Sequence, residues 1–326
     1  MIRIGILGAA KIAPKALIPQ AKKRNDCAVI AVAARDGDRA RAYAARHGIP
    51  EVVESYEALI ARPDIDLIYN ALPPHRHADL SIAALEAGKH VLCEKPFAMN
   101  AREARQMADA ASRTGNHLIE AFHYRFHPMF LDILDKVRNG AIGRLCAMRA
   151  DFSVKIPYSP DELRHRPDLG GGALMDLGCY PLHWLRTIAG SEPRLVSARI
   201  EEGTPGVDLV TEAELEFPGG IPARLRTSMT PDQKTKALLA IKGSEGVLRA
   251  TNPLHPSLGN AISIQRGSEI TRYSVSGETT YDYQLSHMLD VIAGRAAPLT
   301  GGDDAVANMA MIDAIYEAGG LKPRGS

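Results

Sequence analysis

The alternation of short apolar runs with helical patterns over residues 2–122 constrains the fold of this chain more than any other feature. The runs carry few polar residues, as expected for strands with both faces buried, and lie at Ile2–Leu7, Ala28–Ala34, Ile65–Ala71, His90–Cys93 and His117–Phe122. Helical patterns fill the intervals at Lys11–Arg24, Asp38–His47, Ala78–Ala87 and Ala101–Thr114. Strands and helices that alternate in this way predict an α/β domain on a parallel, doubly wound sheet of the Rossmann type.

The second half of the chain has a different rhythm, in which short strands follow one another with turns between them. We expect them at Cys146–Ile156, Leu195–Glu202, Leu209–Phe217, Ala223–Met229, Ala237–Lys242, Ile262–Gln265 and Ile270–Val275. Three glutamates share one face of Leu209–Phe217, and Arg224 and Arg226 share one face of the next strand. This pattern predicts an α+β domain with an antiparallel sheet, one face on the core and ion pairs between strands.

Composition agrees with a globular protein of two domains. The chain has 326 residues, of which 45% are apolar and 24% charged. We expect a cofactor domain over residues 1–122 and a substrate-binding and oligomerisation domain over residues 123–326. Terminal helices at Asp282–Ile292 and Asp303–Ala318 are expected to pack back on one of the two domains.

Charge and cysteine usage exclude several classes of function. The formal net charge is +1, which gives no reason to expect a nucleic acid or a membrane as partner. The four cysteines show no metal-ligand or redox spacing, so we predict reduced thiols in the cytoplasm. The chain starts with a strand rather than a signal peptide, and no apolar run approaches the ~18 residues of a membrane span.

The turn after the first strand indicates a dinucleotide site. Its sequence is Gly8-Ala9-Ala10-Lys11-Ile12-Ala13, which keeps only the first glycine of the G-x-G-x-x-G fingerprint. Alanine allows close backbone approach, although less freely than glycine. A helix after the turn would direct its amino terminus at a pyrophosphate. An ordinary tight turn between a strand and a helix is the alternative explanation.

The end of the second strand favours NADP over NAD. Ala34 occupies the position where an acid would bind the ribose hydroxyls of NAD, and Arg35 follows it. Arg35, helped by Arg39, offers guanidinium groups to a 2′-phosphate. Asp36 has an alternative role as the cap of the next helix.

Two further strands end in residues that suit a cofactor site, because ligands bind at the carboxyl edge of such a sheet. The third strand leads into Asn70, Leu72, Pro73 and His77, which we expect to border the cofactor. For His77, a solvent-facing position at the start of a helix is an equal alternative. The next strand ends in Glu94-Lys95-Pro96, where the neighbours of Lys95 restrict the backbone beside the nicotinamide.

A glycine-rich segment in the second half carries the other candidate groups. Gly170, Gly171 and Gly172 precede an apparent helix on which Asp176, Tyr180 and His183 have the spacing i, i+4 and i+7 of one face. An acid, a phenol and an imidazole make a poor core pattern. The residues next to this face are apolar, which does not suit a helix face exposed to solvent. We therefore interpret the face as the lining of an active site.

Together these elements resemble the family of glucose–fructose oxidoreductase, inositol dehydrogenase and the rhizopine-catabolism oxidoreductases, over nearly the whole chain. The resemblance is carried by Gly5–Ala13, Ala87–Pro96, Glu120–Pro128, Gly170–Tyr180 and Pro298–Tyr316. Inositol-dehydrogenase-like members have histidine where this chain has Tyr180. Tyrosine resembles the branch of dimeric dihydrodiol dehydrogenase and xylose dehydrogenase, which commonly uses NADP. The resemblance implies a mixed second sheet whose open face often forms a dimer.

The residue types then suggest a mechanism for oxidising a secondary alcohol. The hydride goes to the nicotinamide, and the proton needs a base within hydrogen-bond reach. We assign Tyr180 as acid–base group, with Lys95 as the ammonium that lowers its pKa and anchors the substrate oxygen. Asp176 would orient the pair or bind a substrate hydroxyl, and His183 is the alternative acid–base group. Substrate contacts from Arg125, Arg164 and Arg166 are no better supported than solvated side chains.

Several functions fit these groups. The main hypothesis is an NADP-dependent dehydrogenase or reductase acting on a sugar, polyol or cyclic diol, with no metal. One alternative retains the cofactor and couples the oxidation of one sugar to the reduction of another. A transiently oxidising glycosidase is less well matched by the tyrosine motif. A nucleotide-sensing protein without turnover would have no need of Lys95, Asp176 and Tyr180. Substrate identity and reaction direction are not encoded in any motif.

Overall fold

The first sheet has six parallel strands in the order β3-β2-β1-β4-β5-β6. They are β1 (Ile2–Leu7), β2 (Cys27–Ala33), β3 (Glu51–Val53), β4 (Leu67–Asn70), β5 (His90–Cys93) and β6 (Leu118–Glu120). The computed structural model describes residues 1–326 as two units. The N-terminal unit consists of Met1–Phe122 and Tyr281–Val306, and the C-terminal unit of His123–Thr280 and Ala307–Ser326.

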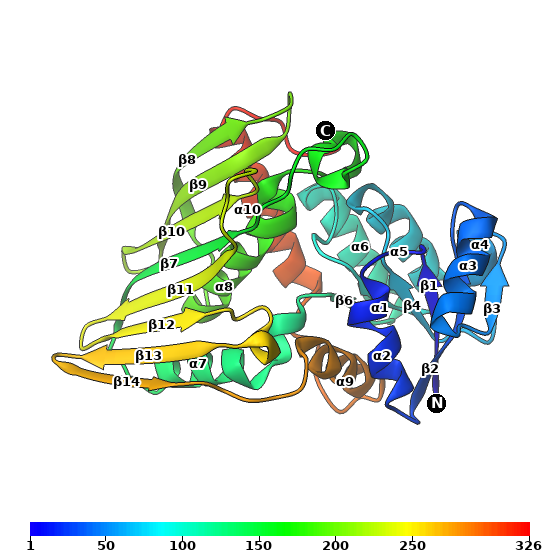
Figure 1. Ribbon diagram of the computed structural model, residues 1–326, viewed down its shortest axis with the longest axis horizontal. Coiled ribbons are helices and arrows are strands. Elements are labelled where there is room, and N and C mark those ends of the chain that lie inside the picture. The colour runs from blue at the N-terminus through cyan, green and yellow to red at the C-terminus, as the bar shows by residue number, and fades with distance from the viewer. The chain divides into compact units, whose positions relative to one another are not determined.

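Both faces of the six-stranded sheet are covered, as the continuous apolar runs predict. Ile4 and Ile6 of β1 share a core with Leu285 and Met288 of α9 (Thr280–Ile292). Between them Gly5 points to the other face, where an added Cβ would lie 2.7 Å from the side chain of Leu59. Figure 1 shows the helices around this sheet, which are α1 (Ala13–Ala16), α2 (Ile18–Lys22), α3 (Gly37–His47), α4 (Tyr56–Ile60), α5 (His77–Glu86), α6 (Ala101–Thr114) and α9. The order of the strands reverses between β1 and β4, and this switch point is where such sheets bind ligands.

The prediction of one continuous helix over Lys11–Arg24 is wrong. The segment is broken into α1 and α2 at Leu17, whose backbone leaves the helical region at φ −138°. Pro19 explains the break, because a proline has no N–H to donate and its ring collides with the carbonyl four residues earlier. The same residue is acceptable in the first turn of a new helix, which is where it lies.

The second sheet has eight strands in the order β14-β13-β12-β11-β7-β10-β9-β8. They are β7 (Leu145–Ser153), β8 (Arg194–Glu202), β9 (Asp208–Phe217), β10 (Ile221–Ser228), β11 (Lys236–Gly243), β12 (Val247–Thr251), β13 (Ala261–Arg266) and β14 (Glu269–Tyr273). Only β7 and β10 pair in parallel, so the sheet is mixed and mostly antiparallel. The pattern missed β12, α7 (Pro128–Arg138) and, in the first unit, the short β3 and α4.

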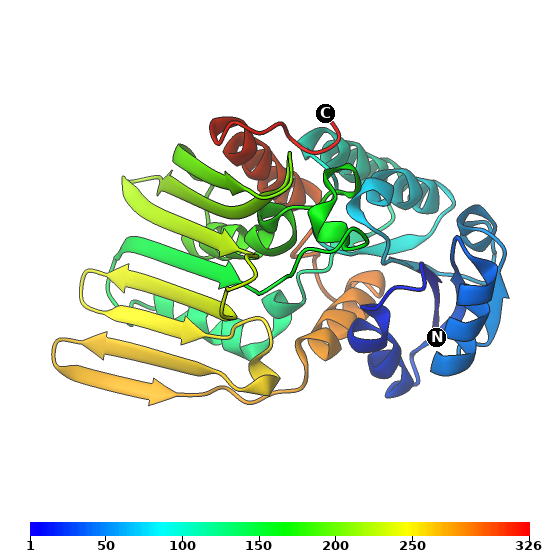
Figure 2. The same ribbon diagram turned by 45° about the horizontal axis from the view of Figure 1, so that its top comes forward.

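One face of the eight-stranded sheet packs on helices and the other is open. Figures 1 and 2 show α8 (Cys179–Ala189) and α10 (Gly302–Ala318) along the same face, with no helix on the opposite one. Ala213, Leu215 and Phe217 of β9 are buried on the covered face, while the glutamates between them alternate to the open face. None of the helices is long and apolar enough to cross a membrane.

Candidate active site

Gly8 follows β1 in a backbone conformation that favours glycine. Its φ is +97°, and an added Cβ would lie 2.9 Å from the Leu72 side chain. The Gly8 amide donates to the carbonyl of Ala33 (2.8 Å), which ties the turn to the end of β2. Ala9, the next residue, is buried, and Ala10 is half-buried. Lys11 is exposed, and the half-buried Ile12 directly precedes α1. Glycine is therefore needed at residue 8 both for the backbone conformation and for the close approach of Leu72.

The two arginines expected to bind a 2′-phosphate lie near this turn. The Arg39 guanidinium donates to the carbonyl of Ala9 (3.0 Å), and the backbone amide of Arg35 donates to the Tyr56 hydroxyl (3.2 Å). Asp36 accepts from the Arg39 amide and so takes the alternative role as the cap of α3. Exposed cations next to this turn fit a dinucleotide that carries an extra phosphate.

Asn70 and His77 hold the loop after β4 from within. The Asn70 amide group donates to Ser81 Oγ (3.1 Å) and to the carbonyls of Arg76 and His77. The ring nitrogens of His77 lie 2.7 Å from the carbonyl of Leu72 and 2.9 Å from that of Pro96. The solvent-facing alternative for His77 is wrong, because the residue is fully buried.

Burial also sets the charge of His77. Desolvation lowers its pKa to about 4, against two backbone carbonyls that favour the charged ring. At neutral pH the ring therefore carries one N–H and donates to one of the two carbonyls. Through this contact the loop that contains Leu72 and Pro73 is joined to the Glu94-Lys95-Pro96 turn.

The Glu94-Lys95-Pro96 turn is fixed at several points within the N-terminal unit. The Glu94 amide donates to the carbonyl of Asn70 (3.0 Å), and the Tyr69 hydroxyl donates to the Glu94 carboxylate. Burial and this carboxylate raise the pKa of Tyr69 well above its usual value. The Lys95–Pro96 peptide is cis, and Lys95 itself is half-buried. The turn therefore presents Lys95 from a backbone with little freedom.

The segment that carries Asp176 and Tyr180 is not a uniform α-helix. It begins as the π-helical turn η5 (Leu174–Gly178) and continues as α8 from Cys179. Such wide turns are frequent at functional sites. The regular spacing assumed from the sequence therefore does not hold across this segment, and each of its three polar residues has a different partner.

His123 is a polar partner of Tyr180. The Tyr180 hydroxyl lies 3.3 Å from His123 Nε2, and both residues are almost completely buried. His183, the alternative acid–base group, instead pairs through Nδ1 with the Tyr124 hydroxyl. His123 and Tyr124 start the short helix η2 (His123–Phe126) and belong to the Glu120–Pro128 motif. No role was assigned to either side chain from the sequence, although the clustered histidines and aromatics of that motif are the signal.

Asp176 holds Arg164 in place. Its carboxylate accepts from Arg164 Nε (2.6 Å), and Glu162 accepts from the same guanidinium (2.8 Å), which raises the pKa of Arg164. Arg166 is exposed and pairs with Asp168 at 2.6 Å. The Arg125 guanidinium lies 5.9 Å from the centre of the Phe130 ring. Of the three arginines considered for substrate, only Arg164 is joined to a candidate catalytic residue by these contacts.

A buried charged cluster anchors the glycine loop before η5. Asp208 accepts from the Leu174 amide (2.6 Å), the Tyr316 hydroxyl (2.8 Å) and the Arg324 guanidinium (3.1 Å). Gly172 lies against it with φ +132°, and an added Cβ would be 2.2 Å from Asp208 Oδ1. This cluster explains why glycine is needed at that position and how the loop is held.

The candidate residues thus form two sets. Gly8, Arg39, His77 and Lys95 belong to the N-terminal unit, together with the rest of the expected cofactor residues. Asp176, Tyr180, His183 and the three arginines belong to the C-terminal unit, where His123 joins Tyr180.

Comparisons with known proteins cover both units. A profile of an oxidoreductase family with an NAD-binding Rossmann fold matches residues 2–122, and a GFO/IDH/MocA C-terminal domain profile matches residues 130–249. D-xylose 1-dehydrogenase (NADP(+)) 2 of Haloferax volcanii is 33% identical over 318 residues, 96% of either chain. Trans-1,2-dihydrobenzene-1,2-diol dehydrogenase of Xenopus laevis is 37% identical over 225 residues, 69% of this chain and 67% of that one.

Two solved structures share the fold over nearly the full chain. A 3-ketoreductase from Actinomadura kijaniata, in complex with NADP and TDP-benzene, has a TM-score of 0.89 and 28% identity, with 97% of each chain covered. An aldose-aldose oxidoreductase from Caulobacter crescentus has a TM-score of 0.88 and 26% identity, with 98% of this chain and 97% of that one covered.

Proposed function

The chain belongs to the Gfo/Idh/MocA family of oxidoreductases, and on this premise we propose that it transfers a hydride between NADP and a secondary alcohol or carbonyl of a sugar, polyol or cyclic diol. The observation that carries the proposal is the buried Tyr180 hydroxyl at the imidazole of His123. A buried phenol at a nitrogen that can accept its proton suits a reaction in which one proton moves with each hydride. The similarity to an NADP-dependent xylose dehydrogenase and to a ketoreductase in complex with NADP supports the cofactor.

We assign the cofactor to the carboxyl edge of the six-stranded sheet. Arg35 and Arg39 would bind the 2′-phosphate of NADP, and the backbone after Gly8 would approach the pyrophosphate. Asn70 and His77 act by shaping the loop, because their side chains bond to protein atoms. The full set is Gly8, Ala9, Ala10, Lys11, Ile12, Arg35, Arg39, Asn70, Leu72, Pro73, His77, Glu94 and Lys95.

In the reaction, bound NADP supplies the acceptor or donor of the hydride. Tyr180 accepts the hydroxyl proton in oxidation and returns it in reduction. Lys95 donates to the substrate oxygen and stabilises negative charge on the phenol. Asp176 keeps Arg164 oriented toward a substrate hydroxyl. In Lys95→Met, the basic limb of the pH–rate profile for reduction should move upward, because the phenol loses a neighbouring cation.

The test is an absorbance screen at the reduced-nicotinamide band, with NADP and NAD against aldoses, polyols, ketoses and trans-diols. We expect turnover with NADP, and Arg35→Ala should lose about 1–3 kcal/mol of the preference for NADP over NAD. Arg46→Ala, on the exposed last turn of α3, is the matched control. Equal or tighter binding of NAD by the unaltered protein would contradict the cofactor assignment.

A second candidate is a sugar–sugar oxidoreductase that keeps its cofactor bound. It is favoured by the structural similarity to the aldose-aldose oxidoreductase. Such an enzyme would purify with nucleotide and convert a sugar pair without added NADP. Cofactor binding with no turnover on any substrate pair would favour a nucleotide-sensing protein instead.

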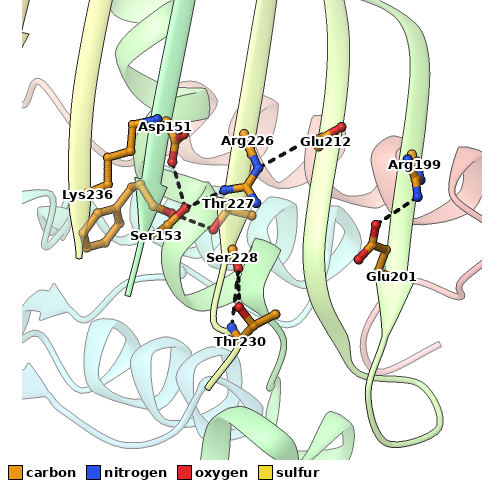
Figure 3. Close-up of polar contacts among 11 residues, drawn as sticks. Asp151, Ser153, Arg199, Glu201, Glu212, Arg226, Thr227, Ser228, Thr230 and Lys236 are labelled. Atoms are coloured by element: carbon orange, nitrogen blue, oxygen red, sulfur yellow. Dashed lines mark hydrogen bonds and ion pairs between the residues drawn. The ribbon is translucent and has the colours of Figure 1, made fainter. Parts of the chain in front are cut away.

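We also infer a homodimer, or a higher oligomer, through the open face of the eight-stranded sheet. Figure 3 shows polar side chains of this sheet, among them Arg226 paired with Glu212 and Lys236 paired with the buried Asp151. Ion pairs between Arg224 and Glu214 and between Arg226 and Glu212 join β10 to β9 on this face. Val196 (49% exposed) and Ile270 (50%) supply apolar surface on its outer strands. A sheet with one uncovered face is well suited to an isologous contact with a second copy.

Light scattering at micromolar concentration tests the assembly. We expect at least twice the mass of the 35.2 kDa chain. Arg224→Glu reverses a charge opposite Glu214 on the open face and should shift the protein toward the monomer, while Arg46→Glu should not. A monomer mass for the unaltered protein would refute the inference. The four free cysteines support a reducing compartment, for which we propose the cytoplasm.

A further inference from the structure

We propose that His123 is a positioning residue that orients the Tyr180 phenol and takes its proton when Tyr180 accepts one from the substrate. The inference deepens the proposed function and rests on it. It concerns a residue outside the Lys95, Asp176 and Tyr180 set, and it gives the proton of the reaction a defined path inside the C-terminal unit.

Position and burial come first. His123 is the first residue of η2 and is 4% exposed, and Tyr180 at the start of α8 is 6% exposed. The Tyr180 hydroxyl lies 3.3 Å from His123 Nε2, and the two rings meet edge to face with their centres 5.8 Å apart. The imidazole is therefore beside the reacting oxygen, out of bulk solvent.

The hydrogen-bond partners on the far side determine which nitrogen carries the proton. His123 Nδ1 lies 2.7 Å from Thr280 Oγ1, and Thr280 Oγ1 lies 3.4 Å from the carbonyl of Leu254. A carbonyl only accepts, so we assign the Thr280 hydroxyl as the donor to Leu254, and its oxygen then accepts from Nδ1. In the neutral ring Nε2 is then the acceptor, and it faces the Tyr180 hydroxyl.

Other rings enclose the pair. The ring of His255 stacks on that of His123 with centres 5.3 Å apart. Tyr124 and His183, the other titratable pair beside Tyr180, bond to each other. The chain Tyr180–His123–Thr280–Leu254 therefore has one direction of donation, from the phenol inward.

The proton balance of oxidation follows from this direction. The substrate O–H bond breaks and its proton goes to Tyr180, while the phenolic proton moves to His123 Nε2. The carbon–hydrogen bond gives its electron pair and hydrogen to NADP, and the substrate becomes a carbonyl. His123 is left as an imidazolium with Nδ1 still donating to Thr280, and it later returns the proton to solvent. Reduction runs the same steps in reverse.

The central test is the pH dependence of alcohol oxidation in His123→Gln, with the substrate found in the screen. Glutamine keeps an acceptor near Nε2 but takes up no proton. We expect kcat to fall by roughly 10- to 100-fold, less than for loss of the acid–base group itself, and the midpoint of the rise in rate to move upward by about one pH unit or more. Thr280→Val removes the acceptor of Nδ1 and should move the midpoint in the same direction by less. His90→Gln, at the amino end of β5, is the matched control.

Nitrogen NMR of histidine-labelled protein provides a second readout that does not depend on turnover. The resonances lost in His123→Gln should show a neutral ring protonated at Nδ1 and not at Nε2. An unmoved pH midpoint with a near-normal kcat, or a ring protonated at Nε2, would overturn the role of His123. If the unaltered protein turns over no substrate in the screen, the proposed function fails, and if Tyr180→Phe is itself active, the acid–base role of Tyr180 fails. If that variant is inactive and His123→Gln behaves as the unaltered protein, only this inference fails.

Discussion

Two clusters of buried polar groups in the C-terminal unit satisfy their hydrogen bonds in different ways. In the cluster around Asp208, the carboxylate accepts hydrogen bonds from several donors, one of which is the Arg324 guanidinium, so that all of these donors converge on one carboxylate. Around His123, a threonine hydroxyl, an imidazole and a phenol form a chain that ends at the Tyr180 hydroxyl. The first arrangement holds one loop in one conformation, whereas the second leaves a proton free to move along it.

The difference teaches what each cluster is for. Burial raises the pKa of Asp208 even with Arg324 beside it, so the negative charge is kept there at a cost in free energy. What the cluster provides is a unique path for the backbone at Gly172, directly before the segment that carries Asp176 and Tyr180. A neutral chain costs less to bury, and its effect is expected in the rate rather than in stability.

Arg324→Met should produce the largest effect on stability, because it removes the cation and leaves the Asp208 carboxylate buried without it. We expect a loss of about 3–5 kcal/mol in the free energy of unfolding at neutral pH. Denaturant titration measures it. The double variant Asp208→Asn, Arg324→Met should lose less than the sum of the single losses. Strict additivity would mean that the two groups do not act as one cluster.

His77 is a buried neutral histidine that takes no part in the proposed proton transfer, and it provides a reference for the effect of burial on an imidazole. The pKa of His77 is lowered to about 4 in the folded protein, against 6.5 for an unperturbed ring. Between these values the unfolded chain binds the proton more readily, so stability falls as the pH drops through this window. The contribution amounts to about 2 kcal/mol between about pH 7 and about pH 5.

His77→Asn should lack this contribution. The difference in unfolding free energy between the unaltered protein and the variant should therefore shrink on acidification. The same difference at both pH values would show that the pKa of His77 is the same in the folded and the unfolded chain, which would contradict the lowered value.

Thr280→Val should give the smallest effect on stability, about 1 kcal/mol or less, because one neutral hydrogen bond is lost. Chemical denaturation of this variant beside Arg324→Met compares the two clusters directly. A loss as large as that of Arg324→Met would show that the His123 chain is also a structural anchor.

Much of this fold could be predicted because local patterns carry it. The unbroken apolar strands specify a sheet covered on both faces, and the alternating glutamates of β9 and arginines of β10 specify an open one. The ion pairs Arg224–Glu214 and Arg226–Glu212 confirm the expected cross-strand contacts. The break of the first helix at Leu17 also has a local cause, because Pro14 and Pro19 are both visible in the sequence. The helical spacing of the apolar residues over Lys11–Arg24 nevertheless led to the prediction of one continuous helix.

The partners of the candidate site could not be predicted, because they come from distant positions in the chain. Thr280 is 157 residues from the imidazole that it accepts from. His123 is 57 residues from Tyr180, and no spacing rule relates a short helix to a later one. The π-helical turn also changes the geometry that a regular period assumes, so Asp176, Tyr180 and His183 have separate partners.

The central claim is that Tyr180 moves the proton that accompanies the hydride. Tyr180→Phe keeps the ring and removes the hydroxyl, and NADP binding by fluorescence titration and turnover by absorbance are measured on the same sample. We predict a loss in kcat on the order of 10²–10⁴-fold with NADP affinity unchanged within about twofold, as expected for an acid–base group that does not hold the cofactor. Near-normal turnover would contradict the claim and would make His183→Asn the next variant to measure.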